Sequence, residues 1–160
     1  MTELRTAELG DVDAICRFGE AHIRPHYTPL IGAAAAADQV RLWWSEPQIR
    51  AAVTSGLVIV AQAGEQLIGV GQRGRRGDDH VIYKLYVDPG HRGNGVGPRL
   101  LEALIKQLPG DAGRLFIEHF AANTRAGAFY EREGFAVDRV EPSPGGDPAL
   151  GVVWRSRPVP

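Results

Sequence analysis

Arg92-Gly93-Asn94-Gly95-Val96-Gly97 lies between an apolar, strand-like run from His80 to Val87 and an amphipathic run from Arg99 to Leu108. Glycines allow a backbone to turn tightly and to approach a ligand closely. A helix that begins after such a turn presents unpaired N–H groups and the positive end of its dipole to an anion. Arg92 adds a fixed cation beside these donors. The stretch therefore predicts a cradle for a pyrophosphate, although an ordinary strand-to-helix turn also uses glycines.

Two other nucleotide-binding motifs do not fit this turn. A P-loop has a Gly-Lys pair followed by Ser or Thr, whereas Gly97 is followed by Pro98 and Arg99. A dinucleotide-binding turn has the spacing Gly-x-Gly-x-x-Gly near the first strand and an acidic residue about twenty positions later. The turn here lies deep in the chain and has a different spacing.

Composition indicates one soluble, unexported domain that spans residues 1–160. The chain has 18 basic and 19 acidic side chains and a net charge of −1, so a site for an anion must be local, and neither nucleic acid nor an anionic membrane is expected as a partner. Cys16 is the only cysteine, which excludes an intramolecular disulfide and a multi-cysteine zinc site and fits a reducing cytoplasm. The N-terminus lacks an apolar segment of signal length, and no apolar run is long enough to span a membrane.

The pattern of apolar and turn-forming residues predicts an alternation of strands and helices. Strands are predicted at Leu4–Ala7, Leu57–Ala63, Gln66–Gln72, His80–Val87, Leu115–Phe120, Phe135–Val140 and Leu150–Trp154. Helices are predicted from Asp11 to a point before Pro25, at Ala33–Trp44, from Pro47 to about Thr54, at Arg99–Leu108 and at Thr124–Glu133. Arg73–Asp79 and Glu141–Pro148 are expected to be loops.

A second stretch, Asn123 to Phe135, follows the glycine turn by about thirty residues. Together the two resemble the signature motifs of the GNAT superfamily of acetyl-CoA-dependent N-acetyltransferases. The first motif of that family, Arg/Gln-x-x-Gly-x-Gly/Ala, is met by Arg92, Gly95 and Gly97; the second, an Asn, a helical Tyr and Gly-Phe, is met by Asn123, Tyr130 and Gly134-Phe135. The resemblance implies an α/β (α+β) fold with a mixed, strongly twisted sheet of about seven strands, flanked by about four helices.

The resemblance also implies that acetyl-CoA is the acetyl donor; no metal is expected. The family pattern assigns the pyrophosphate to Arg92, Gly93, Asn94, Gly95, Val96 and Gly97, and the pantetheine arm to the main chain of Leu85, Tyr86 and Val87, with Asn123 and Tyr130 as further contacts. Pro98 departs from the pattern because it has no N–H, so one phosphate contact is expected to be missing or shifted. The side chains of 85–87 are equally compatible with a place in the core.

Tyr130 corresponds to the family's general acid, which protonates the thiolate leaving group of coenzyme A. A phenol with a pKa near 10 stays protonated at neutral pH, yet it can donate to a thiolate of comparable basicity. The alternative is an aromatic packing residue beside Phe129.

The general base is less well defined, because the glutamate that many members carry on the fourth strand is absent from His80 to Lys84. Glu118 matches the base of the branch that acetylates the N-termini of ribosomal proteins. A charged strand residue paired with an arginine is the alternative interpretation. His119 and His80 are further candidates, although a single histidine among apolar strand residues is more often a packed core residue. A base that acts through ordered water is a third option.

The acceptor is expected to be a primary amine of a small molecule or peptide. His22 and His26 are four residues apart, but Pro25 interrupts their helix and no acidic or cysteine pair joins them, so a metal site is not expected. Their segment, with Tyr27, Trp43 and Trp44, corresponds to the helices that line the acceptor pocket in the family. The resemblance also suggests a homodimer. A non-catalytic acyl-CoA-binding module of the same fold is the alternative function.

Overall fold

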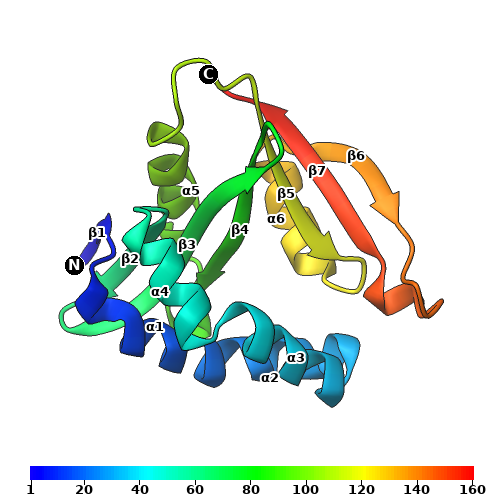
Figure 1. Cartoon of the computed structure of the whole chain (residues 1–160), viewed down its shortest axis with the longest axis horizontal. Helices are drawn as coiled ribbons and strands as arrows, with labels where there is room; N and C mark the ends of the chain where they lie inside the picture. The colour runs from blue at the N-terminus through cyan, green and yellow to red at the C-terminus, as the bar shows by residue number, and fades with distance from the viewer. The chain divides into compact units, whose positions relative to one another are not determined.

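The computed structural model describes all 160 residues, and the chain falls into two compact units. Unit 1 comprises residues 1–73 and 84–107, and unit 2 comprises residues 74–83 and 108–160. Seven strands form a mixed sheet in the order β1-β2-β3-β4-β5-β7-β6 (Figure 1). The mixed sheet and the order of its elements confirm the predicted fold class.

The elements follow one another along the chain with these bounds. They are β1 Thr2–Thr6, α1 Val12–Phe18, α2 Arg24–Ile31, α3 Ala33–Trp43, α4 Glu46–Thr54, β2 Val58–Ala63, β3 Gln66–Arg76, β4 Asp79–Val87, α5 Val96–Lys106, β5 Arg114–Phe120, α6 Thr124–Arg132, β6 Ala136–Glu141 and β7 Val152–Pro158.

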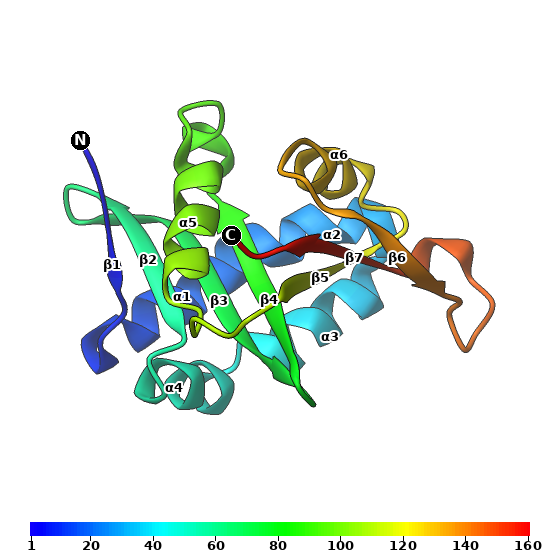
Figure 2. The ribbon, with the colours of Figure 1, turned by 90° about the horizontal axis from the view of Figure 1, so that it is seen from above.

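In unit 1, β2 pairs antiparallel with β1 and β3, and α5 packs along this part of the sheet (Figure 2). Leu100, Leu101 and Leu104 form the buried face of α5. Two glycines of β3 permit this close approach, because a Cβ atom at Gly69 would lie 3.0 Å from Leu100 and one at Gly71 would lie 2.9 Å from Leu104. The predicted apolar helix face therefore meets a strand surface made of glycine.

The helix α1 ends at Phe18, before Pro25 as predicted, but helical structure does not stop there. A turn of π-helix at Gly19–Ile23 joins α1 directly to α2, and Pro25 lies in the first turn of α2. Proline is tolerated there because its missing N–H lies at a point where the register of hydrogen bonds has already changed. Helical structure consequently continues to Ile31, and Gly32, with a φ of 91°, separates α2 from α3.

In unit 2, the beginning of β4 pairs parallel with β5, and β7 pairs antiparallel with both β5 and β6. The predicted loop Arg73–Asp79 is wrong in extent, because β3 continues to Arg76 and β4 already begins at Asp79. Gly77, with a φ of 62°, supplies the left-handed residue of the short turn between these strands. Charged residues thus occupy the ends of β3 and β4. Because a strand is predicted from alternating apolar residues, these charged ends were predicted as loop.

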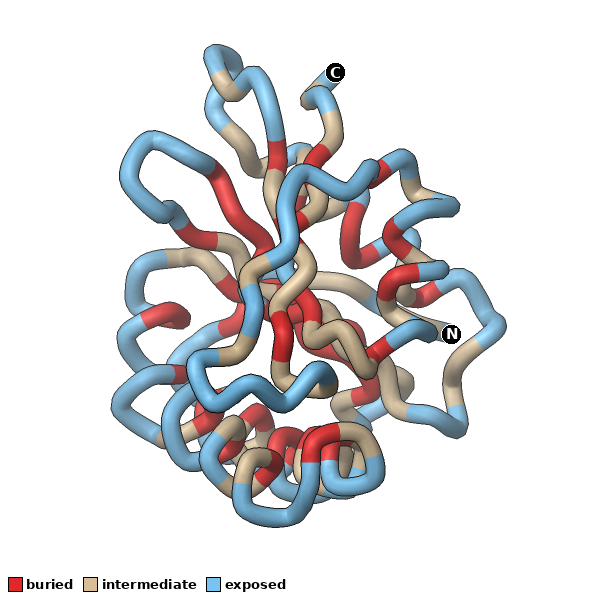
Figure 3. Tube along the Cα trace, turned by 90° about the vertical axis from the view of Figure 1, so that its right-hand side faces the viewer, coloured by how far each residue is buried: buried red, intermediate tan, exposed pale blue.

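The core of each unit consists of the inward-facing residues of its strands and of one side of each helix (Figure 3). Five polar residues are buried among the apolar ones: His80, Lys84, His119, Asn123 and Ser156. No helix combines the length and the apolar character that a bilayer crossing requires.

Candidate functional site

The glycine turn precedes α5 with the geometry of an anion cradle. Gly93 and Gly95 have φ values of 84° and 78°, which other residues rarely adopt, and Gly95 is the N-cap of α5. None of the amides from Gly93 to Gly97 donates a backbone hydrogen bond. Several N–H donors of one turn are therefore available at the positive end of an eleven-residue helix.

The space over this turn is open. A Cβ atom built on Gly93 or on Gly95 would meet no heavy atom within 4 Å, so the need for glycine arises from backbone conformation and not from crowding. Arg92 Nε donates to the carbonyl oxygen of Val87 at 3.3 Å, which ties the turn to the end of β4. The cation predicted beside the cradle is thereby held in place.

The end of β4 carries the three residues predicted to contact the pantetheine arm. Leu85, Tyr86 and Val87 are all half-buried. The Tyr86 hydroxyl is hydrogen-bonded to the hydroxyl of Tyr27, and the Tyr86 ring lies 5.6 Å from that of Trp44. The Tyr86 side chain therefore belongs to an aromatic cluster of unit 1, which leaves the main chain as the part of this segment that a ligand would use.

The two adjacent tryptophans of the predicted acceptor segment have different environments. Trp44 is 4% exposed and packs near Phe18 as well as Tyr86, whereas Trp43 is 50% exposed. A Cβ atom at Gly19 would lie 2.8 Å from Trp44, so this indole fills the place that a larger residue of the first helix would need. Trp44 and Tyr27 thus belong to one cluster, because each contacts Tyr86. Trp43 is not part of this cluster.

Lys84 is a buried cation that the sequence analysis did not single out. Its side chain is 6% exposed, Nζ donates to Gln72 Oε1 at 2.9 Å, and Nζ lies 5.2 Å from the centre of the Trp44 ring. Burial lowers the pKa of Lys84 from 10.5 to about 8. The sequence could have indicated this burial, because Lys84 is two residues from the buried Ile82 and therefore lies on the same face of the strand.

In unit 2, Asn123 and Tyr130 occupy the helix that the second motif predicts. The Asn123 side chain accepts a hydrogen bond from the Ala126 amide at 3.3 Å and caps α6. Tyr130 is buried, with its ring centre 5.4 Å from that of Phe129, 5.8 Å from that of Phe135 and 6.1 Å from that of His119. Packing fixes the orientation of this phenol, so the packing and the catalytic interpretations are compatible.

Glu118 and His119 point to opposite faces of β5, as their adjacent positions require. His119 is buried, its Nδ1 lies 2.8 Å from the Phe120 carbonyl oxygen, and its Nε2 accepts from Arg155 Nε at 3.0 Å. Desolvation, together with the charge of Arg155, lowers the pKa of His119. Because both ring nitrogens are engaged and the neutral form is favoured, His119 fits a structural role better than the role of a base.

Glu118 is exposed and faces away from the side of β5 on which His119 contacts Tyr130. Partial desolvation by the surrounding sheet raises the pKa of Glu118, and the charge of Arg76 opposes this effect. Its register partner on β7 is Trp154, so the two side chains share one face of the sheet. A carboxylate of raised basicity on an accessible strand face is suited to accept a proton.

The remaining candidate base, His80, lies on the other face of the sheet from Glu118. Its register partner is Leu115, a buried residue on the His119 side of β5. His80 is buried, and its Nδ1 has no hydrogen-bond partner. No group of three or more His, Cys, Asp or Glu side chains is arranged to hold a metal ion.

Residues 54–137, more than half of the chain, match the family model described as an acetyltransferase (GNAT) domain. The chain belongs to the GNAT acetyltransferase family. The matched segment contains both motifs of the sequence analysis, Arg92–Gly97 and Asn123–Phe135. A search of curated proteins gives no significant match.

Solved structures of other GNAT proteins share the fold. PaiA N-acetyltransferase from Thermoplasma acidophilum, solved in complex with coenzyme A, has a TM-score of 0.78 and 16% identity over 99% of each chain. The ribosomal-protein-S18-alanine N-acetyltransferase from Escherichia coli has a TM-score of 0.69 and 22% identity over 99% of this chain and 94% of its own. YncA from Salmonella typhimurium, solved with its cofactor acetyl-CoA, has a TM-score of 0.69 and 19% identity over 100% and 95%. At these identities the likeness concerns the fold.

Proposed function

We propose that the protein transfers the acetyl group of acetyl-CoA to a primary amine of a small molecule or peptide. The observation that carries this proposal is the turn from Arg92 to Gly97, in a chain that belongs to an acetyltransferase family. Left-handed glycines, open space and unbonded amides meet at one helix N-terminus. These are the features that a pyrophosphate requires.

The residues present fit acetyl-CoA as the donor. The amides from Gly93 to Gly97 and the guanidinium of Arg92 would hold the pyrophosphate, and Pro98 at the third helical position contributes no donor. The main chain of Leu85–Val87 would hold the pantetheine arm, with Asn123 and Tyr130 as further contacts. When bound, acetyl-CoA supplies an acetyl thioester, whose carbonyl carbon bonds to the amine nitrogen as the C–S bond breaks.

Two proton transfers fall to side chains of unit 2. The Glu118 carboxylate takes the proton that the acceptor ammonium must lose before its nitrogen can attack. Desolvation supports this role because it raises the basicity of Glu118. The Tyr130 hydroxyl gives its proton to the departing sulfur and is restored by the second proton that the nitrogen loses as it becomes an amide. The rings of Phe129 and Phe135 hold the phenol in one orientation.

The proposal is tested by the release of free thiol from acetyl-CoA in the presence of polyamines, aminoglycosides, amino acids and peptides with free N-termini. At least one class should accelerate thiol release well above the rate without amine. Acetyl-CoA binding without stimulation by any of these amines would instead support the non-catalytic binding module.

Calorimetric titration with coenzyme A tests the cradle separately. Arg92→Ala should weaken binding by about 1–3 kcal/mol, because charge-assisted hydrogen bonds are lost. Gly95→Val should weaken it more, because a branched residue strains the left-handed turn. Arg41→Ala, an exposed arginine of α3, is the matched control and should bind as the wild type does. Unchanged affinity in both turn variants would overturn the assignment.

A further inference from the structure

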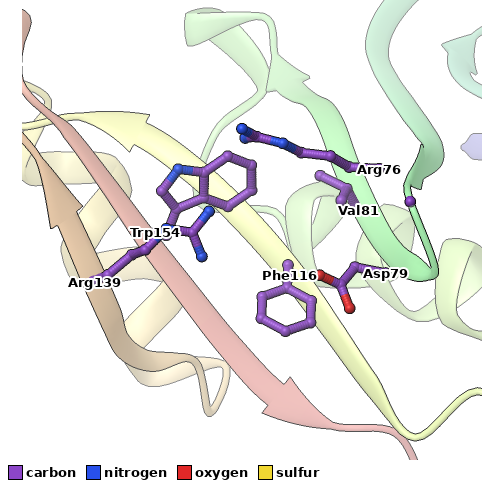
Figure 4. Close-up of a pocket in the computed structure, with 7 residues that line it drawn as sticks. Arg76, Asp79, Val81, Phe116, Arg139 and Trp154 are labelled. Atoms are coloured by element: carbon purple, nitrogen blue, oxygen red, sulfur yellow. The ribbon is translucent and has the colours of Figure 1, made fainter.

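Unit 2 contains a pocket of about 270 Å³ (Figure 4). It lies on the sheet face of Glu118, because its lining residue Trp154 is the register partner of Glu118. Its lining comes from the β3–β4 turn and from the five strands β3 to β7: Arg76, Gly77, Asp79, Val81, Phe116, Arg139 and Trp154. Val81 pairs in register with Phe116, and Arg139 pairs with Trp154. These pairings place the aromatic and aliphatic side chains on one face as an apolar floor.

Two arginines stand over the tryptophan of this floor. The guanidinium carbons of Arg76 and Arg139 each lie 4.8 Å from the centre of the Trp154 ring. A guanidinium held over an aromatic ring keeps N–H donors in its own plane, where they can bind an oxyanion. Trp154 is 2% exposed, whereas both arginines are exposed, so the cations form the rim and the indole forms the base of the pocket.

The positive charge of the pocket is only partly compensated by the protein. Arg139 contacts Asp138 at 3.3 Å and Glu141 at 3.2 Å, but Arg76 has no carboxylate within ion-pair distance. Trp154 Nε1 is buried and has no hydrogen-bond acceptor, although buried donors normally have one.

The charges that line the pocket favour a carboxylate over a doubly charged anion. Arg139 is already paired with two carboxylates, so Arg76 is the one lining cation without an ion pair, and a ligand meets one uncompensated positive charge. A carboxylate is planar and singly charged, and it matches the donor fork of a guanidinium. The apolar floor of Val81, Phe116 and Trp154 suits the carbon atoms attached to such a group.

Glu118 lies next to this pocket. It is the register partner of Trp154 and follows Phe116 by two residues on the same strand face. Both arginines are close enough to act electrostatically on the Glu118 carboxylate. A ligand whose carboxylate lies at the arginines would therefore need only a short connection to place an amine at Glu118.

We propose that Arg76, Arg139 and Trp154 form the carboxylate subsite for the acceptor, and that the acceptor is an amino acid. This inference rests on the proposed function, in which Glu118 takes the proton of the acceptor amine. The pocket then determines specificity: it selects amines that carry a carboxylate and positions them for attack, while the proton transfers remain with Glu118 and Tyr130.

Matched acceptors test the inference through thiol release. Suitable probes are phenylalanine, its C-terminal amide and phenethylamine, which retain the ring and the amine but differ in the carboxylate. Arg76→Gln and Arg139→Gln should each raise the KM for phenylalanine on the order of tenfold or more, because a charge-assisted contact is lost, and should change the KM for the other two little. The comparison is made between variants for each acceptor, since the three amines differ in basicity.

Two further variants control for folding and for general charge. Arg76→Lys should recover part of the phenylalanine KM, because it restores the charge without the planar fork. Arg132→Gln removes an exposed cation elsewhere in unit 2 and should leave the KM for all three acceptors unchanged. If Arg76→Gln and Arg139→Gln fold as the wild type does and have the wild-type KM for phenylalanine, the assignment of the carboxylate subsite is overturned.

Binding without turnover separates this inference from the proposed function. Titration of phenylalanine into the wild type and Arg76→Gln, both saturated with coenzyme A, should show binding that the variant loses. If that binding is present but no amine stimulates thiol release, the catalytic function fails while the carboxylate subsite stands. If amines are acetylated but Arg76→Gln and Arg139→Gln leave the KM for phenylalanine unchanged, the function stands and the subsite fails.

Discussion

At the scale of single residues, the site depends on how packing restricts a few polar side chains. Tyr130 is buried among Phe129, Phe135 and His119, which leaves its phenol little freedom to rotate. His119 uses both ring nitrogens in contacts with the Phe120 carbonyl and Arg155. Glu118, by contrast, is exposed on the opposite face of the same strand. The three residues are close in sequence or space but suit different tasks.

Replacement of Tyr130 by Phe separates proton donation from packing. The ring contacts are retained, so the free energy of unfolding and the affinity for coenzyme A should stay close to those of the wild type. Loss of the hydroxyl should lower kcat by about 100-fold or more, because the leaving sulfur then departs without a proton donor. Steady-state kinetics and urea unfolding give the two readouts. Normal turnover per folded molecule with a large loss of stability would assign Tyr130 to packing alone.

The pH dependence of kcat/KM identifies the base. Glu118 must be deprotonated to accept a proton, and desolvation raises its pKa, so kcat/KM should fall as the pH falls through that raised pKa. Glu118→Gln should lower kcat/KM and remove this acidic limb, because an amide does not titrate. The acceptor should have a known amine pKa, since its own protonation also produces a rising limb.

His80→Gln and His119→Gln are the controls for this profile. Both should keep the acidic limb, and His119→Gln should lose stability because the contact with Arg155 is broken. An acidic limb that persists in Glu118→Gln and vanishes in one histidine variant would transfer the role of base to that histidine. A limb that persists in all three would favour a water relay.

At the scale of elements, helix ends and strand phases decide which residues reach the site. The turn before α5 was predictable, because glycine, arginine and a following amphipathic run are local features of the sequence. The continuation of α1 into α2 was not, because a π-helical turn changes the hydrogen-bond register before Pro25. No local pattern announces such a turn, and proline by itself indicates a helix end.

The same difference applies to the candidate site. Tyr130, Asn123 and Glu118 were proposed from short motifs and remain predictions, whereas no sequence pattern pointed to Lys84 or to the pocket beneath Arg76 and Arg139. Arg76 belongs to β3, Phe116 to β5, Arg139 to β6 and Trp154 to β7, so their proximity depends on strand register. Register is a long-range property, and one sequence without its relatives gives no measure of it.

Lys84 on β4 makes stability depend on pH. Its pKa is about 8 in the folded chain and near 10.5 when unfolded, so the unfolded chain binds more protons between these values and stability rises with pH there. Below about pH 8 the full cost of burying the cation is present, on the order of 3 kcal/mol. Lys84→Met should remove this cost and raise the free energy of unfolding at pH 7 by roughly 1–3 kcal/mol, after loss of the hydrogen bond to Gln72.

Urea unfolding at several pH values from 7 to 10 measures the effect. Between pH 7 and 10, the stability of the wild type relative to Lys84→Met should never increase as the pH falls. The difference between their free energies of unfolding should narrow as the pH approaches 10. Lys106→Met, an exposed lysine of α5, should show a pH dependence like that of the wild type. A Lys84→Met protein that is less stable than the wild type at pH 7 would show that the ammonium is well solvated or paired.

At the scale of the whole molecule, the two units share two strands, β3 and β4, because residues 66–73 of β3 belong to unit 1 and residues 74–76 belong to unit 2. Residues 79–83 of β4 belong to unit 2 and residues 84–87 belong to unit 1. The cradle of 92–97 lies in unit 1, whereas Tyr130 and Glu118 lie in unit 2. The cradle residues and the residues proposed for proton transfer therefore belong to different units, whereas composition predicts a single cooperative domain.

The tryptophans provide a test of this cooperativity, because Trp43 and Trp44 belong to unit 1 and Trp154 belongs to unit 2. Trp154→Phe reports unfolding of unit 1 by fluorescence, and a variant with Trp43 and Trp44 both changed to Phe reports unfolding of unit 2. Because β3 and β4 both have residues in each unit, loss of their pairing should affect the two units together. Within each variant the urea midpoint from fluorescence should therefore equal that from circular dichroism. Saturating coenzyme A should shift both signals together, since a ligand bound only to the folded state stabilises every part that unfolds with it. Separate midpoints, or a shift confined to the unit 1 signal, would show that the units unfold independently and that the single-domain prediction is wrong.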